Sequence, residues 1–118
     1  MPSSNPARRF ADIAREIDLI LQIAAGRSLD DIESDLIALR AIERCFQIIS
    51  EAASKLGAEA ERLCPNHEWR KIRGVGNVLR HAYDNVELDV LWSTISDGKL
   101  EAMRADCLEA IRILSTSN

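Results

Sequence analysis

Apolar residues recur every three or four positions along almost the whole chain of 118 residues, and this spacing restricts the fold more than any other feature. Such spacing places apolar side chains on one face of an α-helix, whereas a half-buried strand needs strict alternation, which occurs nowhere in the sequence. The sequence therefore predicts an all-α protein. Its length is that of a single domain, residues 1–118, with a core of its own.

Capping signals mark the ends of the first helix. Asn5 followed by Pro6 is typical of a helix start, because the asparagine caps free N–H groups and the proline suits the first turn. Gly26 closes this helix. Its apolar stripe consists of Phe10, Ile13, Ile17, Ile20 and Ala24.

A second helix begins at Ser28, where Asp31 three positions later resembles a capping box. The apolar spacing then continues from Leu29 to Leu56 and stops at Gly57. This pattern predicts one long, continuous helix.

The C-terminal half contains shorter helices. A short turn is predicted at 58–63, and Asn66 is expected to cap a helix that runs from His67 to about Tyr83. Two further helices are predicted at 88–95 and 100–114, separated by Asp97-Gly98. Apolar stripes joined by short connections predict an antiparallel up-and-down bundle of four main helices plus short helices.

Composition restricts the class of protein. The net charge of −4 argues against broad nonspecific DNA coating. Acidic residues interrupt every apolar run near the N-terminus, so we expect no signal peptide and no membrane span. The odd count of cysteines, Cys45, Cys64 and Cys107, favours reduced thiols in a cytoplasmic protein.

The segment 69–83, WRKIRGVGNVLRHAY, concentrates positive charge on this acidic chain. Against the single acid Glu68, residues 62–81 carry Arg62, Arg70, Lys71, Arg73 and Arg80. Such a patch is a candidate site for a phosphate-bearing ligand, with Arg70, Lys71, Arg73 and Arg80 as the contacts, although charge alone favours a solvated helix face.

Gly74 and Gly76 lie inside a helical pattern, where each glycine costs about 1 kcal/mol relative to alanine. Close backbone approach to a partner helix or a ligand is one explanation, and a local kink is the other. The stretch follows no strand and lacks the third glycine of a dinucleotide-binding loop, so that function is rejected.

His81 is the best candidate for acid–base chemistry, because imidazole titrates near neutral pH. On a helix Asn77 lies one turn before it on the same face, and Arg73 lies two turns before with an offset of roughly 80°. Arg80 is adjacent in sequence and points about 100° away. A histidine near a guanidinium suits phosphoryl chemistry, since the cation offsets charge that develops on phosphorus.

Other conspicuous residues have simpler interpretations. Trp69 and Trp92 are interpreted as packing anchors, and Tyr83 considered alone as an aromatic residue at the edge of the core. Cys64 and His67 have a spacing that begins some zinc sites, but no matching cluster supplies the remaining ligands. We therefore expect no metal.

Several of these residues together form a motif that resembles the HepT-like toxins, a branch of the HEPN helical domains. The match spans about 41–92 and is carried by Ile48, Ile49, Glu51, Ala52, Trp69, Ile72, Gly74, Asn77, His81, Tyr83 and Trp92. The resemblance implies a metal-independent endoribonuclease without cofactors, which forms a homodimer with two motifs facing one cleft. It also implies cleavage by attack of the RNA 2′-hydroxyl, and a minimal nucleotidyltransferase antitoxin that in some pairs adds AMP to the motif tyrosine, here Tyr83.

The sequence departs from the family pattern at one position. The family arginine lies five residues before the histidine, and Gly76 occupies that position here. Three readings stay open: a ribonuclease in which Arg73 or Arg80 supplies the cation and Asn77 orients, a weakly active or inactive subunit that presents Tyr83 to the nucleotidyltransferase, and a plain helical dimer.

Overall fold

The computed structural model describes residues 5–81 and 88–116, and all regular structure within these ranges is helical. The helices are α1 (Pro6–Ala24), α2 (Leu29–Glu33), α3 (Leu36–Leu56), α4 (Ala58–Leu63), α5 (Trp69–His81), α6 (Leu88–Ser96) and α7 (Lys99–Thr116). None of the helices in the described ranges is long and apolar enough to cross a membrane.

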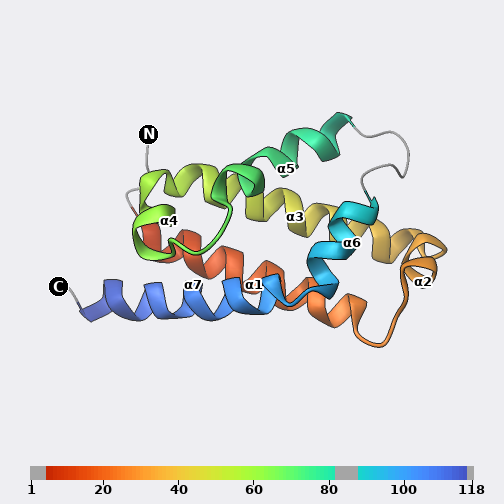
Figure 1. Cartoon of the computed structure of the whole chain (residues 1–118), viewed down its shortest axis with the longest axis horizontal. Helices are drawn as coiled ribbons and strands as arrows, with labels where there is room; N and C mark the ends of the chain where they lie inside the picture. The colour runs from red at the N-terminus through yellow and green to blue at the C-terminus, as the bar shows by residue number, and fades with distance from the viewer. Residues whose placement is uncertain (1–4, 82–87, 117–118) are drawn as a thin grey trace.

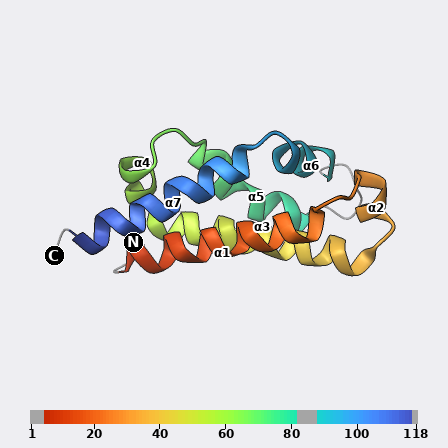
Figure 2. The ribbon, with the colours of Figure 1, turned by 90° about the horizontal axis from the view of Figure 1, so that it is seen from below.

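The four longest helices form the bundle in the order α7, α1, α3, α5, as Figure 1 shows. Helix α1 packs against both α3 and α7, and α5 packs on the far side of α3. Neighbouring long helices run in opposite directions (Figure 1), and the view from below shows α1 and α3 side by side along their lengths (Figure 2). The predicted antiparallel helical bundle is confirmed.

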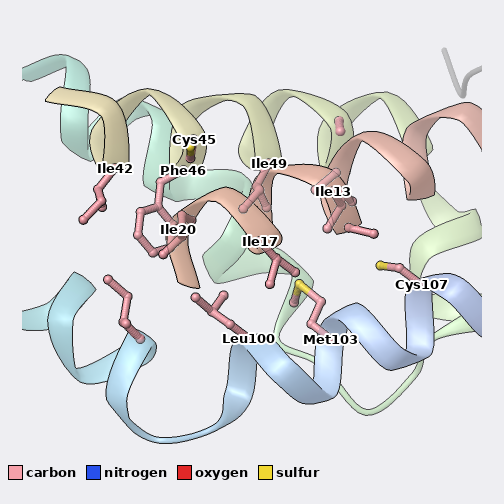
Figure 3. Packing of buried hydrophobic residues seen from close by; sticks show 14 of the residues in the cluster. Ile13, Ile17, Ile20, Ile42, Cys45, Phe46, Ile49, Leu100, Met103 and Cys107 are labelled. Carbon is pink, nitrogen blue, oxygen red and sulfur yellow. The ribbon is translucent and has the colours of Figure 1, made fainter. Parts of the chain in front are cut away.

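The core lies where the apolar faces of α1, α3 and α7 meet (Figure 3). Ile17 of α1, Phe46 of α3 and Met103 of α7 are among its buried side chains. Trp69 is almost fully buried at the start of α5, and its Nε1–H donates to the Cys64 carbonyl over 2.8 Å. Trp92 is partly buried against the same core. Both tryptophans are therefore packing residues, as the sequence predicted.

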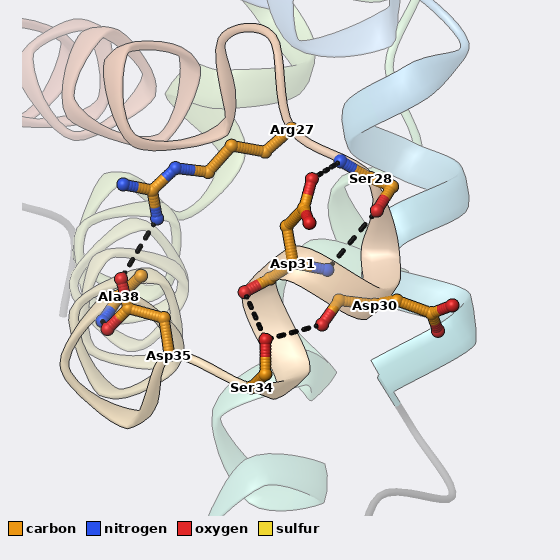
Figure 4. Close-up of polar contacts among 7 residues, drawn as sticks. All are labelled: Arg27, Ser28, Asp30, Asp31, Ser34, Asp35 and Ala38. Atoms are coloured by element: carbon orange, nitrogen blue, oxygen red, sulfur yellow. Dashed lines mark hydrogen bonds and ion pairs between the residues drawn. The ribbon is translucent and has the colours of Figure 1, made fainter.

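The predicted starts of the first two helices are also confirmed. Asn5 caps α1 by accepting from the Arg8 N–H at 3.1 Å, with Pro6 in the first turn. At α2 the capping box is complete. The Ser28 N–H donates to the Asp31 carboxylate over 2.8 Å, and the Asp31 N–H donates to the Ser28 hydroxyl over 3.2 Å (Figure 4).

The prediction of one continuous helix over 29–56 is wrong, because the chain breaks between α2 and α3 at Ser34 and Asp35. The Ser34 hydroxyl donates to the carbonyls of Asp30 and Asp31 and so closes α2 (Figure 4). Asp35 is extended, and its carboxylate accepts from the Ala38 N–H at 3.2 Å as the cap of α3. Short polar side chains compete with helical hydrogen bonds in this way, which apolar spacing does not reveal.

Helix α5 begins at Trp69, so the prediction that Asn66 caps a helix from His67 is wrong. The His67 ring is instead held by α7, with 2.6 Å between its Nε2 and the Asp106 carboxylate. This contact with a residue distant in sequence delays the helix start. The predicted helix end near Tyr83 lies outside the described residues.

The three cysteines, all within the described residues, form no disulfide bond, in agreement with the predicted reduced thiols. Cys45, Cys64 and Cys107 are free and buried. Burial, followed by hydrogen bonding to Glu16, raises the pKa of Cys45 to about 11. A hydrogen bond to Cys64, together with burial, raises the pKa of Cys107.

Candidate functional site at the groove between α3 and α5

A polar groove of about 610 Å³ lies between α3 and α5, and Gly76 is one of the residues that line it. Its lining residues are all charged, polar or glycine: Arg44, Gln47, Ser50, Glu51, Ser54, Lys55, Arg73 and Gly76. Most come from one face of α3, and α5 contributes Arg73 and Gly76. The groove therefore combines one end of the motif helix with a helix that begins about 30 residues earlier in the chain.

Ser50 joins the two helices at the base of this groove. Its hydroxyl donates to the Arg73 carbonyl over 2.8 Å and accepts from the Gly76 N–H at 3.2 Å. The serine is buried, so these bonds satisfy a polar group that water does not reach. A Cβ at position 76 would lie 2.9 Å from the Ser50 Oγ, closer than real contacts allow. Gly76 thus permits close approach to a partner helix, one of the two predicted explanations.

Gly74 differs from Gly76. A Cβ added at Gly74 would meet no atom within 4 Å, so no packing inside this chain requires a glycine there. Its predicted role in close approach stays a prediction, and any such contact would be to another molecule.

Arg73 is anchored to the end of α3 and to α4. Its Nε donates to the Ala53 carbonyl over 3.2 Å and its Nη2 to the Gly57 carbonyl over 2.8 Å. The guanidinium also makes a two-pronged ion pair with Glu61, at 2.7 and 2.9 Å. Hydrogen bonding to Glu61 raises the pKa of Arg73, and the same contact lowers the pKa of Glu61. Every nitrogen of the guanidinium is therefore engaged within the protein.

The other predicted cations whose side chains the structure describes lie apart from the groove. Arg70 and Lys71 are exposed in the first turn of α5, and Lys71 pairs with Glu68 at 2.7 Å. Arg62 pairs with Glu59 on α4. The structure thus brings Arg73 to the groove while Arg70 and Lys71 lie on the solvent side of α5.

The groove contains two further cations, Arg44 and Lys55, which the run of positive charge near the motif does not include. One signal was available: polar residues at positions 44, 47, 51, 54 and 55 recur at helical spacing. At 100° per residue they form one stripe opposite the apolar face of the helix.

The remaining motif residues are described in part. The backbone of Asn77, Arg80 and His81 continues α5 as a regular helix, which keeps Asn77 one turn before His81 on the same face. Their side chains, and Tyr83 altogether, lie outside the described residues.

The Cys64–His67 pair is used in packing between the loop before α5 and helix α7. Cys64 Sγ donates to the Asp106 carbonyl over 3.5 Å, and His67 contacts the Asp106 carboxylate. Within residues 5–81 and 88–116, no three His, Cys, Asp or Glu side chains are arranged to hold a metal ion.

Comparison with known proteins agrees with the motif. The family model described as "Ribonuclease HepT-like" matches residues 13–110, which is most of the chain and includes all of α3 and α5. The chain belongs to the HepT-like ribonuclease family.

Individual relatives support this assignment. A protein of Thermococcus cleftensis named "Probable ribonuclease HepT" is 32% identical, over 79% of this chain and 90% of the relative. A protein of Caldanaerobacter subterraneus, named as a candidate RNase, is 30% identical over 76% of this chain and 80% of its own length. No solved structure matches the chain significantly.

Proposed function

We propose that this protein is a metal-independent endoribonuclease and the toxin of a toxin–antitoxin pair. The observation that carries the proposal is the HepT-like match across residues 13–110, which includes the α5 segment bearing Asn77 and His81. The polar groove next to this segment supports it, because RNA cleavage needs a water-exposed surface that accepts a charged backbone. By family resemblance the working form is a homodimer in the cytoplasm.

In the proposed reaction His81 takes the proton from an RNA 2′-hydroxyl. The 2′-oxygen then bonds to the adjacent phosphorus while the bond to the 5′-oxygen breaks. The products are a 2′,3′-cyclic phosphate and a free 5′-hydroxyl, whose proton is returned by an imidazolium. The imidazolium is either that of His81 itself, which holds the proton from the 2′-hydroxyl, or that of His81 in the second protomer.

A cation is needed where negative charge develops on the phosphoryl oxygens. Gly76 supplies none, and the Arg73 guanidinium is held by Glu61 and two carbonyls. Releasing Arg73 would leave Glu61 and the end of α3 without their partner. We therefore assign the cation to Arg80, with Arg73 acting as a positioning residue that fixes α5 against α3.

A second function is favoured by the contact between Ser50 and Gly76. Here the chain is a weakly active or inactive subunit that binds a minimal nucleotidyltransferase antitoxin and presents Tyr83 as the acceptor of AMP. An arginine at position 76 would displace the Ser50 hydroxyl, so the packing at this point suits a motif without its arginine.

The test is cleavage of a mixed RNA pool in EDTA by the parent, His81→Ala, Arg80→Gln and Arg73→Gln. We expect the parent to cleave RNA and to leave product ends that carry a cyclic phosphate. We expect His81→Ala and Arg80→Gln to lose this activity. Cleavage by His81→Ala at the parental rate refutes the catalytic assignment.

If the parent protein cleaves no RNA, the next variant to test is Gly76→Arg in a Ser50→Ala background. The Ser50→Ala change removes the Oγ that an added Cβ at position 76 would meet. Ser50→Ala alone is the matched control. Ribonuclease activity that appears only in the double variant supports the second function, because the parent then lacks only the cation needed for cleavage.

A further inference from the structure

We propose that the polar face of α3, through Arg44 and Lys55, binds the phosphate backbone of the RNA next to the cleavage motif. The inference rests on the proposed ribonuclease function and extends its substrate-binding surface to a helix outside the motif. Both residues line the groove whose opposite wall carries Gly76.

The two cations are placed along one edge of the groove. They are 11 positions apart on α3, which corresponds to about 16 Å along the helix axis. At 100° per residue the two side chains differ in direction by only about 20°. They therefore mark a line along the groove, and a flexible single strand can contact both ends with different phosphates.

Small residues keep part of the surface between them open, beside the longer side chains of Gln47 and Glu51. Ser50 and Ser54 come from α3, and Gly76 contributes no side chain from α5. The exposed Ser54 hydroxyl offers a hydrogen bond to a phosphate or sugar oxygen, whereas the Ser50 hydroxyl is already bonded to α5. The same glycine that removes the family arginine thus opens the surface over which the backbone would pass.

Both cations are available for phosphate. Lys55 is exposed and makes no ion pair within the described residues. Arg44 has two long contacts, an ion pair with Glu51 at 3.6 Å and a hydrogen bond to the Gln47 Oε1 at 3.4 Å, and the side chains of Arg44 and Glu51 are more than half exposed. Exposed pairs of this kind contribute little, so a phosphate can replace the carboxylate. By contrast, Arg73 on the same groove is committed to Glu61.

The composition of the groove favours nucleic acid over a protein partner. The centres of protein–protein interfaces are enriched in aromatic and apolar residues, and none of the lining residues is apolar. On a chain with net charge −4, the groove has three cations against one carboxylate, and two against one when the paired Arg73 is set aside. This is the local positive surface that a phosphate backbone requires.

The test measures binding of a fluorescent single-stranded 2′-O-methyl RNA of mixed sequence, which lacks the free 2′-hydroxyl needed for cleavage. Affinity is followed by anisotropy as a function of salt for the parent, Arg44→Gln, Lys55→Gln and the double variant. Arg112→Gln on α7 is the matched control, since its side chain is 63% exposed and that of Arg44 is 61% exposed. Arg44→Lys tests whether a positive charge at this position is sufficient for RNA binding.

Each neutralised contact is expected to reduce the salt slope by about 0.7 and to weaken binding about fivefold near 0.1 M salt, as counterion release from a single strand implies. By the same relation, the double variant is expected to bind RNA about 25-fold more weakly than the parent. Arg112→Gln should match the parent, and Arg44→Lys should keep the parental slope. Urea midpoints equal to that of the parent show that the variants are folded.

The inference is overturned if the double variant binds RNA with the parental affinity and salt slope. It is overturned as well if Arg112→Gln loses as much RNA affinity as the groove variants. It is also overturned if the double change weakens self-association in sedimentation while RNA binding is kept, because the groove is then a protein interface. Failure of the proposed enzyme is distinct: a parent that binds this RNA but cuts no RNA refutes the ribonuclease and keeps the binding surface.

Discussion

The contact between Ser50 and Gly76 predicts that two glycines on one helix respond in opposite ways to the same substitution. Gly74→Ala should stabilise the protein by about 1 kcal/mol, the difference in helix propensity, because the added methyl group meets nothing within 4 Å. Gly76→Ala gains the same propensity but places its Cβ 2.9 Å from the Ser50 Oγ.

The magnitude at Gly76 follows from what Ser50 would lose. Its hydroxyl must move, and it gives up hydrogen bonds to the Arg73 carbonyl and the Gly76 N–H, worth roughly 0.5–1.5 kcal/mol each. Against a gain of about 1 kcal/mol, the net change is a destabilisation of about 0–2 kcal/mol. In a Ser50→Ala background the nearest atom is the residue 50 Cβ at 3.4 Å, an ordinary contact, so Gly76→Ala should then stabilise by about 1 kcal/mol.

The assay is urea unfolding followed by far-UV circular dichroism for the four members of this cycle and for Gly74→Ala. Measurements at several protein concentrations separate unfolding from any change in self-association. We expect a coupling free energy of about 1–3 kcal/mol between positions 50 and 76. Equal stabilisation by both glycine substitutions, or a coupling free energy below about 0.5 kcal/mol, would show that Ser50 does not restrict position 76.

Three further predictions concern caps, pH and thiols. Asp35→Ala removes the cap of α3 and should lower the urea midpoint, whereas Glu33→Ala, which removes no cap, should leave it nearly unchanged. Contact with Arg73 holds the pKa of Glu61 below its ordinary value of 4.5, so this pair stabilises the fold above that pH and less as the pH falls through the folded value. Glu61→Gln should therefore reduce the loss of thermal stability on acidification below about pH 5, and an unchanged pH profile would contradict the pairing. Because Cys45 is buried with its pKa raised to about 11, and Cys107 is fully buried, neither should react with a thiol reagent at pH 8 until urea unfolds the protein. Rapid labelling in native buffer would contradict this packing.

Most of the secondary structure could be predicted because its causes are local. The caps at Asn5 and Ser28 act within three residues, and an apolar stripe is a property of one helix. The two errors have different origins. The break at Ser34 and Asp35 depends on hydrogen bonds from short polar side chains to nearby backbone groups, which an unbroken apolar stripe does not reveal. The late start of α5 depends on His67 meeting Asp106, 39 positions away, which no local pattern contains.

The candidate site likewise has some features that follow from local sequence and others that depend on tertiary packing. The sequence alone determined the family resemblance, the glycine at position 76 and the spacing of Asn77 and His81, since all of these are identities and intervals along the chain. The residues that surround them depend on how the helices pack against one another. Ser50 reaches Gly76 across 26 positions.

Arg73, which sequence reasoning placed in the reaction, is taken up by α3 and α4. Arg44 and Lys55, which no motif includes, line the groove. The physical reason is that hydrogen bonds and charge interactions depend on distances in space, and those distances are set by how helices far apart in the chain pack together.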